Sequence, residues 1–309
     1  MEPYPRKRRY HRIAHEISII MLYLFLSIVI NALLFVIFKY FSIYKVNNLH
    51  AIVVNYFVAF LVGFFFDKSD FSMAVLPEKP WFTGTLFLGV LFITFFNVIA
   101  LTTQKTGLSV VSISSKMSVV VPVIFAFILY NDHITLLKIV GILMALLALY
   151  MVTKKTASLS VEKKYLYLPV LLFAGTGLID TLFKYIELHF VKPDETYIFS
   201  AIIFLTAGVS GVIFLIVTSC FKPIIFKLKS LIAGVILGIP NFFSVYFLLE
   251  ALKTNGLESS YVYPVNNVGI VLLSTLFGIL LFNEKLTNFN KIGILIAISG
   301  IVLMNIASW

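Results

Sequence analysis

One lysine, Lys116, lies deep inside an apolar stretch and is surrounded by serines. It is about ten residues from the nearer end of Thr106–Tyr130, or ~15 Å in a helix. A charge at that depth does not easily reach water, and it costs about 2.5–3.5 kcal/mol on insertion scales. Ser109, Ser112 and Lys116 share a helical face, and Ser115 lies beside it. An ammonium among hydroxyls suits a carboxylate or phosphate ligand. The alternative is a structural lysine that donates to carbonyls of a neighbouring helix.

Amides and tyrosines form a second group, mainly around Pro264. Proline removes a backbone donor and can leave carbonyls free to face a cavity, while amides supply both donors and acceptors. Isolated amides in membrane segments more often join helices than bind ligands. Together with Lys116, Ser112 and Ser115, the predicted substrate-binding residues are Asn97, Asn241, Tyr261, Tyr263, Asn266 and Asn267.

Four further charged residues are assigned to gating or coupling: Lys39, Asp180, Lys184 and Glu250. Asp180 and Lys184 are four residues apart, so they are able to pair along one helical face and lower the cost of insertion. Lys39 and Lys184 are near the ends of their apolar stretches, where long side chains also reach the interface. Glu250 is expected at an interface as well.

The sequence predicts no catalytic residue, no metal site and no cofactor. It has a single cysteine, Cys220, and its five histidines fall at the ends of apolar stretches, in loops or in the N-terminal tail. A membrane-embedded enzyme that acts on lipids would need an acid, base or metal constellation, and a retinal-type Schiff base at Lys116 is a remoter alternative. A nucleotide-binding loop of the Gly-x-x-x-x-Gly-Lys-Ser/Thr kind is absent, which argues against ATP as the energy source.

The elements that hold these residues must be membrane helices. The chain is 60% hydrophobic and 12% charged, with a mean hydropathy of +1.02, which excludes a soluble globule. Crossing a bilayer takes about 20 apolar residues, and backbone amides in lipid must be satisfied within their own helix. The apolar runs do not alternate as barrel strands do. We predict ten transmembrane helices: Ile19–Ile43, Leu49–Phe66, Trp81–Thr103, Thr106–Tyr130, Thr135–Thr153, Tyr165–Glu187, Tyr197–Thr218, Leu228–Leu252, Gly256–Phe282 and Asn288–Trp309.

The chain also repeats itself. Asn131–Thr135 returns as Asn283–Thr287 at an offset of 152, and Phe38–Tyr40 returns as Phe183–Tyr185 at an offset of 145, as does Gly63 at Gly208. Two similar halves with an odd number of spans must be inverted relative to each other. We therefore predict an all-α membrane protein of two inverted five-helix repeats. Its expected parts are a basic tail (1–18), a first repeat (19–153), a polar linker (154–164) and a second repeat (165–309).

Motifs in both halves resemble a known transporter family. Ser260–Ser274 followed by Phe282–Leu286 is similar to the last two helices of small multidrug resistance proteins. Both halves together resemble EamA-like members of the drug/metabolite transporter superfamily, with Ala251–Thr254, Lys39 and Lys184 among the matching elements. The resemblance implies a ten-helix carrier with cytoplasmic termini, whose relatives carry amino acids, drugs, nucleotide sugars or sugar phosphates. The membrane glutamate in the first helix of small multidrug resistance proteins has no match here, so their proton coupling is not implied.

From these observations we expect a secondary transporter that exports a small metabolite by alternating access, with a buried lysine in its central cavity. The alternatives are an efflux carrier for cationic compounds held by aromatic rings and, less favoured, a lipid-processing enzyme. The expected partners are a small-molecule substrate and the lipid bilayer, with the chain a monomer or homodimer in the cytoplasmic membrane. The net charge of +10 is spread over tail and loops, which favours membrane-surface contact over nucleic acid. Lysine and arginine divide nearly equally between the two sides, and Met21 offers an alternative start.

Overall fold

The computed structural model describes residues 5–66, 72–121, 124–125, 136–153, 163–220, 227–253 and 259–306. Every regular element in these ranges is helical, as predicted. The long helices are α1 (Pro5–Ile43), α2 (Asn48–Phe66), α3 (Phe82–Thr106), α4 (Leu108–Met117), α6 (Leu136–Thr153), α7 (Tyr167–Phe190), α8 (Thr196–Ser219), α9 (Leu228–Lys253), α10 (Ser259–Phe282) and α11 (Asn288–Ile306). Short 3-10 helices are η1 (Met73–Glu78), η2 (Lys163–Tyr165) and η3 (Pro193–Glu195).

Several of these helices are long and apolar enough to cross a membrane, so the chain is a multi-pass membrane protein. Among the described residues seven qualify: Met21–Ile43, Asn48–Phe66, Phe82–Thr106, Tyr167–Phe190, Thr196–Ser219, Leu228–Ala251 and Val265–Phe282. Two shorter apolar helices, Ile139–Ala148 and Asn288–Leu303, lie in α6 and α11. The fourth predicted span begins with α4 and continues into residues that are largely undescribed. A count of ten therefore stays a prediction, as do the boundaries of the two repeats.

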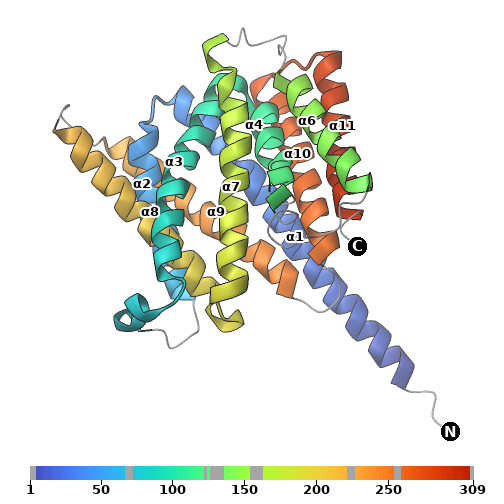
Figure 1. Cartoon of the computed structure of the whole chain (residues 1–309), viewed down its shortest axis with the longest axis horizontal. Helices are drawn as coiled ribbons and strands as arrows, with labels where there is room; N and C mark the ends of the chain where they lie inside the picture. The colour runs from blue at the N-terminus through green and yellow to red at the C-terminus, as the bar shows by residue number, and fades with distance from the viewer. Residues whose placement is uncertain are drawn as a thin grey trace.

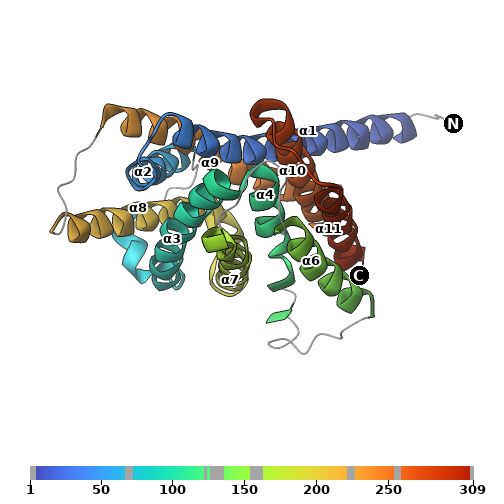
Figure 2. The same cartoon turned by 90° about the horizontal axis from the view of Figure 1, so that it is seen from above.

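The contacts between helices follow a pattern that repeats when the two halves of the chain are interchanged. When α1, α2, α3, α4 and α6 are matched in order with α7, α8, α9, α10 and α11, most of the larger contacts map onto another observed contact or onto themselves, with α1–α3 an exception. Thus α1 packs on α9 and α10, whereas α7 packs on α3 and α4, and the α2–α9 contact corresponds to α8–α3. The α6–α11, α2–α8 and α4–α10 contacts each join a helix to its own counterpart, with α6 and α11 adjacent at one edge (Figures 1 and 2). Two similar halves related by a two-fold axis produce this pattern.

Small residues allow the closest of these approaches. A Cβ on Gly89 of α3 would lie 2.7 Å from the backbone nitrogen of Ala207 in α8, and a Cβ on Gly238 of α9 would lie 2.7 Å from the carbonyl oxygen of Asn55 in α2. Close backbone approach at small residues is a common means of joining membrane helices, where lipid supplies no hydrophobic drive. The two glycines match at an offset of 149, and the two contacts join corresponding pairs of helices, α3–α8 and α9–α2.

Candidate functional site

The site is built around α4, whose first turn is held by a carboxylate from the second half of the chain. Glu284 is buried, and its Oε1 accepts a hydrogen bond from the Leu108 backbone N–H at 2.7 Å. Its Oε2 accepts from the Ser109 hydroxyl at 3.2 Å. A negative charge at a helix N-terminus satisfies unpaired donors and complements the helix dipole. Gly107 has φ +98°, and a Cβ there would lie 2.6 Å from Glu284 Oε1, so this position requires glycine.

The helix is interrupted beside Lys116. α4 ends at Met117, and Ser118 and Val119 form a turn before helical geometry resumes at Val120. The serine hydroxyls here donate to carbonyls of the preceding turn, among them Ser115 to Val111 at 2.9 Å. Such back-bonding bends helices and favours local breaks. Broken membrane helices leave backbone and side-chain polar groups available where a cavity exists.

Lys116 faces a carboxylate on the neighbouring helix. Its ammonium interacts electrostatically with Asp180 of α7, and the Ser118 hydroxyl donates to Asp180 Oδ2 at 3.4 Å. Lys116 is half-buried and Asp180 is exposed, so the pair borders open space and is not sealed in the bundle. The structure has no ion pair between Asp180 and Lys184, although it describes both. The expected pairing along α7 is therefore not observed. Asp180 instead accepts a hydrogen bond from Ser118 across the α4–α7 interface, and it influences Lys116 electrostatically, without an N···O contact within 4.0 Å between these two described residues.

Neutral polar groups gather where α1, α9 and α10 meet. The Ser27 hydroxyl donates to Asn266 Oδ1 at 3.0 Å, and Asn31 Nδ2 donates to the Ser27 carbonyl at 3.0 Å. The Ser27 hydroxyl also approaches the carbonyl of Ser244 in α9 at 3.4 Å. Asn241, three residues before Ser244, is buried. The Nδ2 of Asn241 has no hydrogen-bond partner within the described part of the chain. Contacts α1–α10 and α4–α7 correspond in the two halves, so one interface carries this neutral polar cluster where the other carries Lys116 and Asp180, although the residues themselves do not align.

Other predicted binding residues have different surroundings. Ser112 is fully buried and donates to the Ser109 carbonyl, whereas Ser115 and Asn267 are half-buried. Tyr261 and Tyr263 belong to α10, but their side chains lie outside the described residues.

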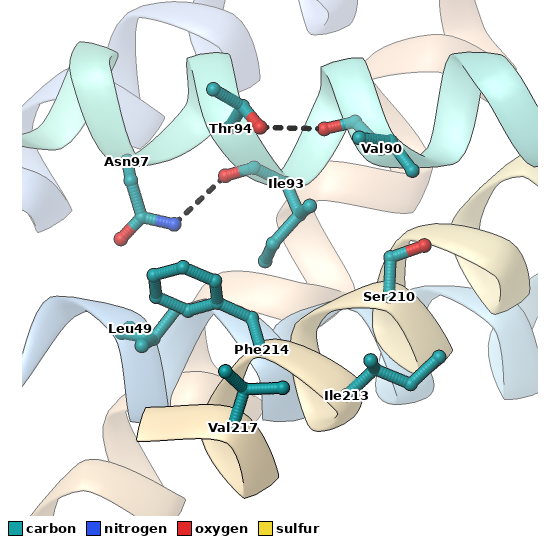
Figure 3. A pocket seen from close by; sticks show the side chains of 9 residues that line it. All are labelled: Leu49, Val90, Ile93, Thr94, Asn97, Ser210, Ile213, Phe214 and Val217. Carbon is teal, nitrogen blue, oxygen red and sulfur yellow. Dashed lines mark hydrogen bonds between the residues drawn. The ribbon is translucent and has the colours of Figure 1, made fainter. Parts of the chain in front are cut away.

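Asn97 lies away from the charged pair, in a pocket between α3 and α8 (Figure 3). The cavity volume is about 560 Å³, and most of the lining is apolar, with Val90 of α3 and Phe214 of α8 on facing sides. Asn97 Nδ2 donates to the Ile93 carbonyl at 2.8 Å.

Of the four residues assigned to gating or coupling, Asp180 lies near the middle of α7, whereas Lys39, Lys184 and Glu250 lie nearer the ends of their helices. Lys39 donates to the Thr103 carbonyl at 3.5 Å and interacts electrostatically with Glu284. Lys184 is exposed on α7. Glu250 accepts a hydrogen bond from the Tyr197 hydroxyl, which joins the C-terminal end of α9 to the beginning of α8.

Loops at one end are joined by a second buried acid. Glu195 of η3 accepts hydrogen bonds from Lys79 Nζ at 2.6 Å and from Trp81 Nε1 at 2.8 Å. Burial raises the pKa of the Glu195 carboxyl, but these hydrogen bonds and the Lys79 charge outweigh it and hold the pKa below its ordinary value. The contact ties the α2–α3 connection to the start of α8.

Residues that sequence reasoning did not assign to the site are Ser27, Asn31, Ser118, Ser210 and Glu284. Glu284 had a detectable signal, since it belongs to the motif repeated at an offset of 152. The hydroxyls gave none, because serine is frequent in membrane helices. Within the described residues, no group of three or more His, Cys, Asp or Glu is arranged to hold a metal ion.

Comparisons with known proteins match the two halves of the chain in turn. A model of the EamA-like transporter family matches residues 18–154 and 167–306. A protein of Haemophilus influenzae described as uncharacterized is 27% identical over 260 residues, covering 81% of this chain and 86% of that protein. A solved crystal structure is similar with a TM-score of 0.57 at 15% sequence identity, covering 90% of this chain and 96% of its own. At that identity the likeness shows the fold alone.

Proposed function

The chain belongs to the EamA-like transporter family, and we propose that it is a secondary carrier that exports a small polar metabolite by alternating access. The observation that carries the proposal is the Lys116–Asp180 pair at the interruption of α4. Charged groups within a membrane bundle are costly, and those that border open space mark substrate pathways. Substrate sites of such carriers lie between repeats, at interrupted helices.

The charge pattern narrows the substrate class. Lys116 offers an ammonium to a carboxylate or phosphate, but the neighbouring Asp180 carboxylate repels a simple anion. A substrate that carries a donor or cationic group next to its anionic group contacts both residues favourably. We therefore favour a metabolite with both kinds of group over a plain organic anion.

A cationic compound is the second candidate, and the exposure of Asp180 is the observation that favours it. The carboxylate alone would then bind the substrate, while Lys116 would weaken binding. The two candidates consequently predict opposite effects of removing the lysine charge.

A resistance panel distinguishes them. Cells that express the wild-type chain, Lys116→Met or Asp180→Asn are challenged with toxic amino acid analogues, organic anions and lipophilic cations at matched expression. We expect protection against compounds with both charge types, lost in both variants. Protection against lipophilic cations alone, retained or increased in Lys116→Met, would contradict the favoured substrate class.

A further inference from the structure

The pocket between α3 and α8 lies at the edge of the bundle. Of the long helices, α8 packs mainly on α2 and α3, and it forms an outer edge of the molecule (Figure 2). Val90, Phe214 and Val217 line the pocket and are each more than half exposed: 51%, 54% and 53%. The pocket therefore opens sideways, towards the hydrocarbon of the bilayer.

Polar atoms lie at hydrocarbon depth in this pocket. Asn97 and Ser210 are each nine residues from the end of their helix, Thr106 and Ser219 respectively, or ~14 Å. Among the described residues, no donor reaches Asn97 Oδ1 and no hydrogen bond engages the Ser210 hydroxyl. Thr94 donates to the Val90 carbonyl and keeps acceptor capacity. Unsatisfied polar atoms facing lipid are costly, so a ligand with a donor would relieve the cost.

Residues that correspond to the α3 wall of the pocket in the other half of the chain are aromatic. Gly89 matches Gly238 at an offset of 149, and Gly63 matches Gly208 at 145. With these offsets, Gly211, Ile93, Thr94 and Asn97 correspond to Phe66, Phe242, Phe243 and Tyr246. The Phe66 ring lies 5.8, 5.4 and 5.8 Å from the rings of Phe242, Phe243 and Tyr246. The repeated fold alone therefore does not require an open pocket, since Ile93, Thr94 and Asn97 line it on α3 where the matching α9 residues carry packed rings.

The depth of the polar atoms determines which class of ligand is able to reach them. A phospholipid headgroup remains at the interface, so it does not bring a donor ~14 Å inward. A compact lipophilic molecule dissolved in the bilayer is able to bring a hydrogen-bond donor to that depth. We infer that the α3–α8 pocket is a second binding site, distinct from the Lys116–Asp180 pair, for a neutral lipophilic compound whose single N–H or O–H group donates to Asn97 Oδ1. This site does not depend on the proposed transport function.

A matched pair of probes tests the assignment. N-phenyl-1-naphthylamine has an apolar body and one N–H donor, and its N-methyl derivative lacks the donor. Each is titrated into the purified full-length protein in detergent, and affinity is taken from the rise in melting temperature. We expect the N-methyl derivative to bind the wild-type chain about fivefold to tenfold more weakly, the worth of one hydrogen bond.

Three variants complete the test. Asn97→Leu should weaken the N–H probe by the same factor and leave the N-methyl probe unchanged. Asn97→Tyr, which copies Tyr246, should fill the pocket and abolish binding of both. Leu280→Tyr, on the exposed face of α10, is the control and should change neither. Equal stabilisation of all variants by both probes would overturn the site. A normal N–H preference in Asn97→Leu would overturn the ligand class.

Discussion

Lys116 and Asp180 act on each other from different helices, and this interaction makes a prediction about charge balance. Removing either charge leaves the other without its electrostatic partner, at a moderate cost because Lys116 is half-buried and Asp180 is exposed. We expect Lys116→Met and Asp180→Asn each to lower the melting temperature and to reduce transport at least tenfold. The double variant should regain most of the melting temperature but no transport, because the site for the substrate charges is gone.

The combination of melting and transport separates a binding role from a structural one. If the pair serves only to stabilise the bundle, the double variant should transport as well as the wild type. Reconstituted flux per molecule, measured beside detergent melting, gives both quantities for each variant. Lys116→Arg is the matched control, since it keeps the charge on a larger, planar group and should retain partial activity.

Glu284 stabilises the start of α4, so its substitution should lower the stability of the protein. Glu284→Gln keeps the shape but weakens the charge-assisted hydrogen bonds to Leu108 and Ser109, so we expect a loss of about 1–2 kcal/mol. Gly107→Ala should be at least as damaging, because the added Cβ meets Glu284 and the backbone has φ +98°. Thermal melting checks both, and Leu280→Ala, on the exposed face of α10, is a comparison in which little change is expected.

At the scale of elements, Glu195 should make stability depend on acid pH. Its folded-state pKa lies below the ordinary value of 4.5, so its contribution is complete above that value and is lost as the pH falls through the folded pKa. We expect the melting temperature of the wild-type chain to fall in this acid range more steeply than that of Glu195→Gln. Parallel pH profiles of the two proteins would show that the contacts with Lys79 and Trp81 do not carry this stability.

The helices were predictable from the sequence because lipid permits few alternatives. The length of each apolar stretch was enough to locate a helix in each predicted span. The motifs repeated at constant offsets indicated that the two halves would have similar helix contacts. The interruption of α4 after Met117 was not predicted, although the sequence carried a signal for it: Pro122 has no backbone N–H to donate to the carbonyl of Ser118, four residues earlier. Serine hydroxyls that compete for backbone carbonyls add to this effect, and hydropathy registers neither cause.

The site was predictable only in part. Lys116 stood out by its depth, but the spacing of Asp180 and Lys184 suggested a pair along one helix, whereas the partner of Asp180 lies across an interface. Spacing within a helix identifies possible neighbours on that helix and says nothing about the helix packed against it. Asn97 was grouped with the central residues for the same reason, although it lines the pocket beside α8.

At the scale of the whole molecule, the two halves share their packing and differ in their chemistry. One interface, α4–α7, carries the charged pair, and its counterpart, α1–α10, carries Ser27, Asn31 and Asn266. A two-fold framework gives a carrier two equivalent ways to open, and the unlike half-sites allow it to bind an unsymmetrical substrate in one orientation. This asymmetry is the reason we favour a metabolite with unlike polar groups.

The most direct test is counterflow in proteoliposomes that contain the purified chain and a compound selected by the resistance panel. Vesicles loaded with unlabelled compound should take up labelled compound transiently, and Lys116→Met at equal reconstitution should do so at least tenfold more slowly. Both results follow if one site, containing Lys116, alternates between the two sides. Chemical conversion of the compound without any movement across the membrane would contradict a carrier, and undiminished counterflow by Lys116→Met would remove that lysine from the site.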